Sequence, residues 1–212
     1  QTHRELEIIV SIDASPKAAE SGMILERFQL RHPGTRVQWH RQRSRLHWVA
    51  NVNFLLSMSK GEFVMFMQED DWIPPEYIQK LYECLDGDPL TANCYPHILF
   101  VDNSFFQRTG HSFFQRRQNQ TSFVGSQRQR VDRVVAQCCA VSFRGLVRRP
   151  QHGSMQPFFL PRLYQNFYLA DTVQMVYHSI AGHLKEVDVP YYKVKRPDSV
   201  MGASVRNRTS SV

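Results

Sequence analysis

Short apolar runs alternate with helix-like segments through residues 7–86 of this 212-residue chain, and this alternation limits the possible fold more than any other feature. Strands are expected at residues 7–12, 36–40 and 63–67, the last being the most apolar run. Helices are expected at residues 16–30, 47–58 and 74–86, the first with Ser15 as its N-cap. Strands separated by helices are typical of an α/β protein with a mostly parallel sheet.

The second half of the chain is less regular. Further strands are expected at residues 94–101, 134–141, 184–189 and 191–194, with a helical turn at 143–148 and a helix at 170–180. Residues 103–130 have no sustained period and are expected to form long loops or a hairpin. Residues 201–212 hold almost no core residues and are expected to be a flexible tail. A chain of this length suits one domain or two small ones.

Charge and cysteine usage narrow the classes of protein. The hydrophobic fraction of 42% rules out a disordered chain. The formal net charge is +7, and between Asn103 and Ala170 the only acidic residue is Asp132, so an arginine-rich segment faces either solvent or an anion. The four cysteines show no C-x-x-C spacing, so we expect all of them to be reduced packing residues of a protein from a reducing compartment.

Carboxylates follow two of the expected strands. Asp13 comes after the first strand, and Asp70 and Asp71 come after the strand at residues 63–67. In an open α/β sheet, ligands bind beyond the carboxyl ends of the strands. Adjacent carboxylates repel one another unless they are solvated or hold a cation, and Mg²⁺ or Mn²⁺ favours such oxygen ligands beside a phosphate. The alternative is that residues 69–71 only solvate the start of the next helix.

The order of these motifs resembles the nucleotide-sugar half of family 2 glycosyltransferases, which have the GT-A fold. The matching parts are a strand ending in Asp13-Ala14-Ser15, the pair Asn51 and Asn53, and the run from Gly61 to Glu76 that contains Asp70-Asp71. The resemblance covers residues 1–90 well and the remainder loosely. It implies one GT-A-like domain, with residues 1–90 binding the nucleotide sugar and residues 91–200 forming an acceptor and catalytic half.

The resemblance also implies roles for single residues on the donor side. Asp13, with Ser15 beside it, matches the aspartate that bonds the nucleotide base, and Asn53 matches a helix asparagine near the nucleotide. Asp71 matches a ligand of a divalent cation, and Asp70 a contact to the ribose or sugar or to the same cation. This chain has Gln68 where the first aspartate of the family's DxD motif often stands.

On the acceptor side, Asp171 matches the aspartate that serves as the catalytic base. Lys193 and Arg196 lie in a basic segment that resembles the end of the family's core and could meet the pyrophosphate. The expected reaction is an inverting transfer from a nucleoside diphosphate sugar, with UDP favoured, to an acceptor hydroxyl, assisted by Mg²⁺ or Mn²⁺. The acceptor would be a saccharide, a lipid-linked molecule or a protein, as in the synthesis of cell-envelope polysaccharides.

Other interpretations remain open at this level. The arginine-rich segment with its phenylalanines would also suit a nucleic-acid-binding protein or a non-catalytic relative. No specific nucleic acid is expected, and the cytoplasm, with possible contact to the inner face of a membrane, is the expected location. Relatives have a strand and a helix before the segment equivalent to residues 1–7. We therefore expect either a fragment or a sheet completed by another segment or chain.

Overall fold

The computed structural model describes residues 1–102, 113–118, 122–137, 141–150 and 170–195. Within these ranges strands and helices alternate through the first half, as the sequence predicted. The strands are β1 (Glu7–Ile12), β2 (Arg36–Arg41), β3 (Phe63–Met65), β4 (Thr91–Asp102), β5 (Phe113–Gln118), β6 (Leu146–Arg148) and β7 (His183–Lys195). The helices are α1 (Ala18–Arg31), α2 (His47–Met58), α3 (Tyr77–Asp86), α5 (Gln127–Gln137) and α6 (Ala170–Ala181), with a short 3₁₀ helix η1 at Val141–Arg144.

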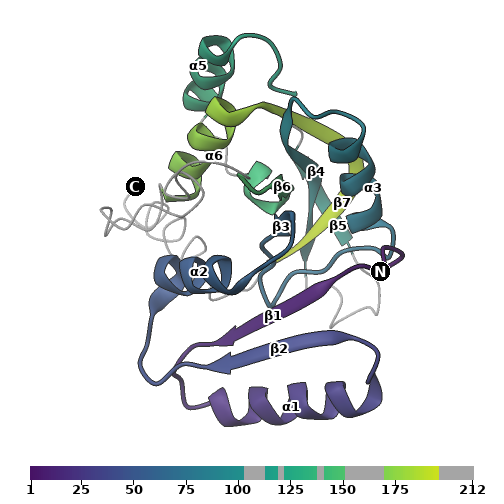
Figure 1. Ribbon diagram of the computed structural model, residues 1–212, viewed down its shortest axis with the longest axis vertical. Coiled ribbons are helices and arrows are strands. Elements are labelled where there is room, and N and C mark those ends of the chain that lie inside the picture. The colour runs from purple at the N-terminus through teal and green to yellow at the C-terminus, as the bar shows by residue number, and fades with distance from the viewer. Residues whose placement is uncertain (103–112, 119–121, 138–140, 151–169, 196–212) are drawn as a thin grey trace, which may run out of the picture.

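The described strands form two sheets (Figure 1). β1 and β2 pair in parallel, with α1 lying along them. In the five-stranded sheet β4 pairs in parallel with β7 and antiparallel with β5 and β6, and β3 is antiparallel to β6. The α/β class is therefore confirmed, although the described strands are more mixed in direction than a mostly parallel sheet. Whether a further strand completes the sheet stays a prediction.

Two hydrophobic clusters lie on opposite faces of β4. Neighbouring residues of a strand point to opposite sides of its sheet. Cys94 packs in the cluster that α3 covers, with Tyr77 and Leu81, whereas Tyr95 packs in the cluster that includes Met175 of α6. The sheet is thus covered by α3 on one face and α6 on the other.

Three local predictions are corrected by the structure. Ser15 does not cap α1: the helix begins at Ala18, whose N–H donates to the Ser15 carbonyl at 3.1 Å. Residues 134–137 are the last turn of α5 rather than the start of the strand expected at 134–141, because Arg130 and Val134, four residues apart, both turn into the interior. The segment at 143–148 is divided between η1 and the strand β6. The expected tail at 201–212 lies outside the described residues.

The expectation for the cysteines was wrong for one pair. Cys84 of α3 and Cys94 of β4 form a disulfide, with their Cα atoms 6.3 Å apart. The link arises because the chain turns back after α3, so residues ten positions apart meet where the helix packs on the sheet. The cysteines therefore give no support to a reducing compartment. Cys138 and Cys139 lie outside the described residues.

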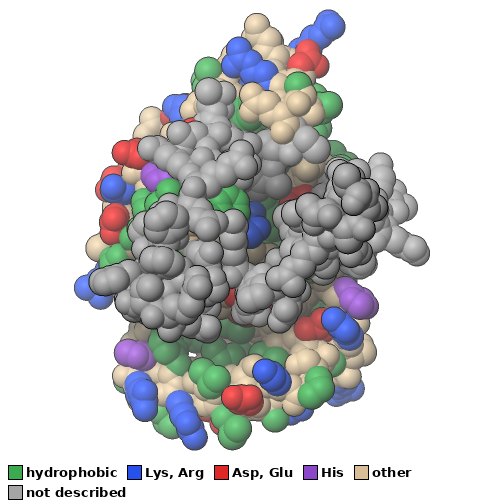
Figure 2. Space-filling view, turned by 180° about the vertical axis from the view of Figure 1, so that it is seen from behind, with side chains coloured by type: hydrophobic (Ala, Val, Ile, Leu, Met, Phe, Trp, Pro, Cys, Tyr) green, Lys and Arg blue, Asp and Glu red, His purple; other side chains and the backbone are tan. Residues whose placement is uncertain are grey.

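Several arginines in the described part of the basic segment form hydrogen bonds inside the fold, whereas Arg128 and Arg133 are exposed. Arg130 donates to the carbonyls of Ser179 and Gly125, and Arg148 and Arg149 donate to backbone carbonyls of other elements. Figure 2 shows the Lys and Arg side chains of the lower part of the molecule mixed with acidic and hydrophobic ones. This use of arginine favours a structural role over the continuous basic surface that nucleic acid requires.

One glycine allows β6 to approach β4 closely. A Cβ atom at Gly145 would lie 2.5 Å from the Cys94 carbonyl oxygen and would also overlap the Asn93 side chain. Since the obstructing oxygen belongs to the backbone, a larger residue could be accommodated only if the strands moved apart. Gly145 therefore fixes the position of Arg144, the residue before it, beside the start of β6.

Candidate active site

Asp71 is buried at the end of the segment that follows β3. Only 6% of the surface of Asp71 is exposed to solvent. The Tyr191 hydroxyl of β7 donates a hydrogen bond to Asp71 Oδ2 at 2.9 Å, and Arg144 Nε lies 4.0 Å from the same oxygen. Asp70 is half-buried. The tandem carboxylates therefore differ: Asp71 is held inside the protein, and Asp70 is the more accessible of the two.

Arg144 is a member of this site that the sequence did not reveal. Its Nη2 donates to Gln68 Oε1 at 3.1 Å, and its guanidinium carbon lies 5.6 Å from the centroid of the Tyr191 ring. The Tyr77 hydroxyl donates to the Arg144 carbonyl at 2.7 Å. No local pattern marks Arg144, because its partners come from β7, α3 and the segment after β3. The only related signal was Gln68, which stands where a DxD aspartate is common.

Asp171 lies in the first turn of α6, as the sequence predicted. The Thr172 N–H donates to Asp171 Oδ1 at 2.8 Å, and a carboxylate in this position also interacts favourably with the helix dipole. Burial raises the pKa of Asp171, although the Thr172 N–H and the positive charge of Arg144 partly oppose the shift. A carboxylate with a raised pKa is a stronger base than an ordinary aspartate, which suits proton abstraction.

Lys193 of β7 joins these groups into one cluster. Burial lowers the pKa of Lys193, and the nearby Arg144 charge lowers it further. The negative charges of Asp71, Asp70 and Asp171 act in the opposite direction on the same pKa. The charges of three predicted acids therefore act on one predicted basic residue, Lys193.

Asp13 and Ser15 lie at a second place, beside an open hollow. The hollow has a volume of about 360 Å³ and is lined by residues from the ends of β1 and β2, among them Ser15, Arg41 and Arg43. The Asp13 carboxylate accepts N–H bonds from Ala14 at 3.0 Å, Leu46 at 2.7 Å and His47 at 3.1 Å. Asp13 therefore anchors the start of α2 to the end of β1, and it has acceptor capacity left for a ligand.

Two other predicted residues are not at an accessible position in the described part of the chain. Asn53 of α2 is only 3% exposed, which favours a role in packing this helix. Arg196 lies outside the described residues. Within the described ranges no group of three or more His, Cys, Asp and Glu side chains forms a cage for a metal ion.

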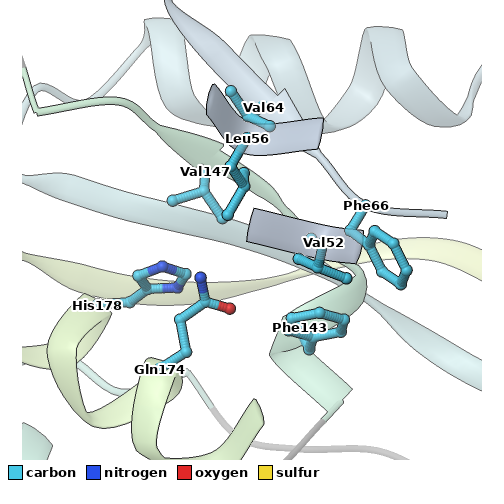
Figure 3. A pocket seen from close by; sticks show the side chains of 9 residues that line it. Val52, Leu56, Val64, Phe66, Phe143, Val147, Gln174 and His178 are labelled. Carbon is cyan, nitrogen blue, oxygen red and sulfur yellow. The ribbon is translucent and has the colours of Figure 1, made fainter. Parts of the chain in front are cut away.

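His178, seven residues after Asp171 in α6, is buried beside a cavity of about 20 Å³ (Figure 3). In that view His178 and Gln174 lie next to each other, opposite Val52 and Leu56 of α2. The Nδ1 atom of His178 is 3.4 Å from Asn93 Nδ2, and the buried Nε2 atom of His178 makes no hydrogen bond to the described residues. Burial lowers the pKa of His178 to about 4.

The free energy of unfolding is expected to fall in mild acid because of His178. The unfolded histidine binds a proton with a pKa of 6.5, but the folded one binds it only near pH 4, so stability is lost as pH drops through this window. The full loss is about 3 kcal/mol, since one pKa unit corresponds to about 1.4 kcal/mol. Urea unfolding at stepped pH would measure it.

The control compares two histidine variants. His178→Gln should flatten the pH dependence between pH 6.5 and 4, the two values that bound the shift of this group. His32→Gln, at an exposed position after α1, should keep the dependence of the original protein. Equal pH dependence in both variants would show that another group causes the acid loss.

Comparison with known proteins agrees with this geometry. The family model described as glycosyl transferase family 2 matches residues 1–187. The glycosyltransferase GlyG of Streptococcus pneumoniae serotype 4 (strain ATCC BAA-334 / TIGR4) is 28% identical over 116 residues, which are 53% of this chain and 37% of that protein. The crystal structure of S. aureus TarS 1–349 matches with a TM-score of 0.61 at 14% identity, over 90% of this chain and 51% of that chain.

These comparisons confirm the resemblance seen in the sequence and the GT-A type of fold. The chain spans about a third of the length of GlyG and about half of the TarS chain. The match to TarS is one of fold, because only 14% of the residues are identical. Among the described helices, none combines the length and the hydrophobicity that crossing a membrane requires.

Proposed function

The chain belongs to glycosyl transferase family 2, and we propose that it transfers a sugar from a nucleoside diphosphate sugar to an acceptor hydroxyl with inversion at the anomeric carbon. The favoured donor carries UDP. The observation that carries this proposal is the buried Asp71, bonded by the Tyr191 hydroxyl at 2.9 Å beside Arg144, together with Asp171 and Lys193, whose charges act on the same group of side chains. These side chains include a candidate base and groups suited to a charged leaving group.

Asp171 is the proposed general base. As the acceptor oxygen attacks the anomeric carbon, Asp171 would take the hydroxyl proton, and the bond between that carbon and the diphosphate would break on the opposite side. The Thr172 N–H bond to Oδ1 holds the carboxylate in one orientation, and its raised pKa favours proton uptake. The products are a glycoside of inverted configuration and a nucleoside diphosphate.

The tandem aspartates fit a divalent cation. Mg²⁺ or Mn²⁺ is commonly held by one or two carboxylates together with phosphate oxygens of the substrate, and Asp70 and Asp71 supply carboxylates of this kind. When bound, the cation would neutralise negative charge on the leaving diphosphate. Because the Asp71 Oδ2 atom already accepts the Tyr191 hydroxyl, Asp70 is the better placed ligand, and Asp71 would contribute its other oxygen.

The remaining predicted residues would bind other parts of the donor. Asp13 and Ser15, beside the hollow at the end of β1, are proposed to contact the nucleotide base, with Asn53 supporting α2 behind them. Lys193 and Arg196 are proposed to meet the diphosphate. Residues 1–90 would form the donor half and residues 91–200 the acceptor half. A saccharide, lipid-linked or protein acceptor of the cell envelope, reached from the cytoplasmic side of a membrane, is the proposed partner.

Thermal unfolding with a panel of nucleotides tests the proposed function. UDP with Mn²⁺ is expected to raise Tm, because a ligand at 100 times its Kd adds about 2.7 kcal/mol to stability. For a chain of this size that corresponds to about 5–10 °C. Uridine with Mn²⁺, and UDP with EDTA, should give smaller shifts. If no nucleoside diphosphate raised Tm in the presence of Mn²⁺ or Mg²⁺, the proposed function would be wrong.

A further inference from the structure

Arg144 is a buried cation whose Nε–H donor has no hydrogen-bond partner among the described residues. The residue is 8% exposed, and a guanidinium carries five N–H donors. One donor group, Nη2, bonds Gln68 Oε1 at 3.1 Å, whereas the buried Nε makes no hydrogen bond to the described residues. Its nearest acid, Asp71 Oδ2, is 4.0 Å away, beyond hydrogen-bond distance. Burying unsatisfied donors on a charged group is costly, so this arrangement favours an anionic ligand.

The guanidinium is held in one position before any ligand binds. The Tyr77 hydroxyl bonds the Arg144 carbonyl at 2.7 Å, and the Tyr191 ring lies 5.6 Å from the guanidinium carbon. The next residue, Gly145, packs so closely against Cys94 that no side chain would fit there. A ligand would therefore meet a fixed cation, and little ordering entropy would be lost on binding.

A second cation, Lys193, interacts electrostatically with Arg144. Lys193 is half-buried, and Arg144 and Lys193 repel each other, as the effect of Arg144 on the Lys193 pKa shows. An anion between two positive groups of low exposure would relieve this repulsion. Diphosphate, with several anionic oxygens, can accept bonds from a guanidinium fork and an ammonium together.

Gln68 orients the guanidinium of Arg144 without neutralising the positive charge of that group. A carboxylate at the position of the Gln68 amide would form an ion pair with the guanidinium at 3.1 Å. The neutral amide leaves the positive charge available. The departure of this chain from the aspartate common at that position is thus accounted for by the contact with Arg144.

We propose that Arg144, oriented by Gln68, binds the diphosphate of the donor together with Lys193 and holds it as the leaving group. This inference rests on the proposed function and extends it to a residue outside the family's sequence motifs. Arg144 would contact the phosphate oxygens directly, whereas Gln68 is a positioning residue that acts through Arg144.

Calorimetric titration with UDP and with inorganic pyrophosphate, in EDTA, tests the role of Arg144 without a metal ion. Arg144→Met should weaken binding of both ligands about 10- to 100-fold, the usual cost of losing a charged hydrogen bond. Arg130→Met is the matched control, because Arg130 is also 8% exposed but, within the described residues, bonds the carbonyls of Ser179 and Gly125. That control should lower Tm yet keep both affinities.

A near-isosteric variant keeps the test decisive if Arg144→Met is poorly folded. Gln68→Glu should pair with Arg144, keep or raise Tm, and weaken pyrophosphate binding in EDTA about tenfold. Gln68→Met should weaken it less, because the charge of Arg144 stays available. Unchanged affinities in Gln68→Glu and Arg144→Met, with UDP still bound by the original protein, would overturn this inference alone. Failure of the original protein to bind UDP with Mn²⁺ would overturn the proposed function as well.

Discussion

Replacing Asp171 with Asn is expected to lower kcat for sugar transfer about 10²- to 10⁴-fold, which is the usual contribution of a general base. The amide has nearly the same shape and can still accept the Thr172 N–H, but it cannot take the acceptor proton. KM for the donor and the affinity for UDP should change little, because this carboxylate acts on the acceptor. Steady-state kinetics with UDP titration would separate the two effects.

Stability provides an internal control for this substitution. Because burial raises the pKa of Asp171, its ionised form is destabilised in the folded protein. The neutral amide of Asp171→Asn should therefore leave the free energy of unfolding equal or higher. Asp132→Asn, at an exposed position on α5, should change neither stability nor rate by much. A fully active Asp171→Asn enzyme with normal folding would remove this residue from the mechanism.

The pH dependence of kcat gives a second readout for the same base. A general base must be ionised, so the rate should fall as pH drops through the pKa of Asp171. Because burial raises this pKa, the acid limb should lie at higher pH than for an ordinary aspartate. The acid limb should disappear from the residual activity of Asp171→Asn.

Asp71→Ala is expected to cost about 3 kcal/mol of stability, the lower end of the usual loss when one partner of a buried ion pair is removed. The substitution removes the acceptor of the Tyr191 hydroxyl and leaves the buried Arg144 without its nearest negative charge. Tm should fall by roughly 6–12 °C for a chain of this size. Differential scanning calorimetry of the ligand-free protein would measure the loss.

The neighbouring aspartate is the natural comparison. Asp70 is half-buried, so Asp70→Ala should change the free energy of unfolding by less than about 1 kcal/mol. It should nevertheless abolish most of the additional stabilisation that Mn²⁺ gives to the UDP complex. Equal stability losses in the two variants would contradict the distinction between a buried and an accessible carboxylate in this tandem.

Local signals predicted the parts of the fold that short stretches of chain determine. The bounds of β1 and α2 match those expected, and α6 extends only one residue further, because apolar periodicity and stop signals are encoded within each segment. The end of α5 was missed because Val134-Val135-Ala136 resembles the start of a β-branched, apolar strand. Its helical face becomes visible only when Arg130 is seen to be buried against α6.

The candidate site likewise contains residues that the sequence predicted and a residue that it did not. Asp70, Asp71, Asp171 and Lys193 were predicted because each follows or opens a recognisable element, and the charges of the three acids act on Lys193. Arg144 was missed because its hydrogen bond to Gln68 joins residues 76 positions apart, a contact that no local pattern encodes. The Cys84–Cys94 disulfide was missed for a related reason, since it depends on how α3 turns back against β4.

The close approach of Gly145 to β4 has a consequence for how this protein can vary. If a library of all single substitutions were selected for activity, variants should be lost even at Gly145, a position that touches no substrate. Gly145 would tolerate replacement as poorly as Arg144, because any side chain there meets the Cys94 carbonyl and displaces the neighbouring guanidinium. Sequence variation around the site would then be limited by backbone space as much as by chemistry.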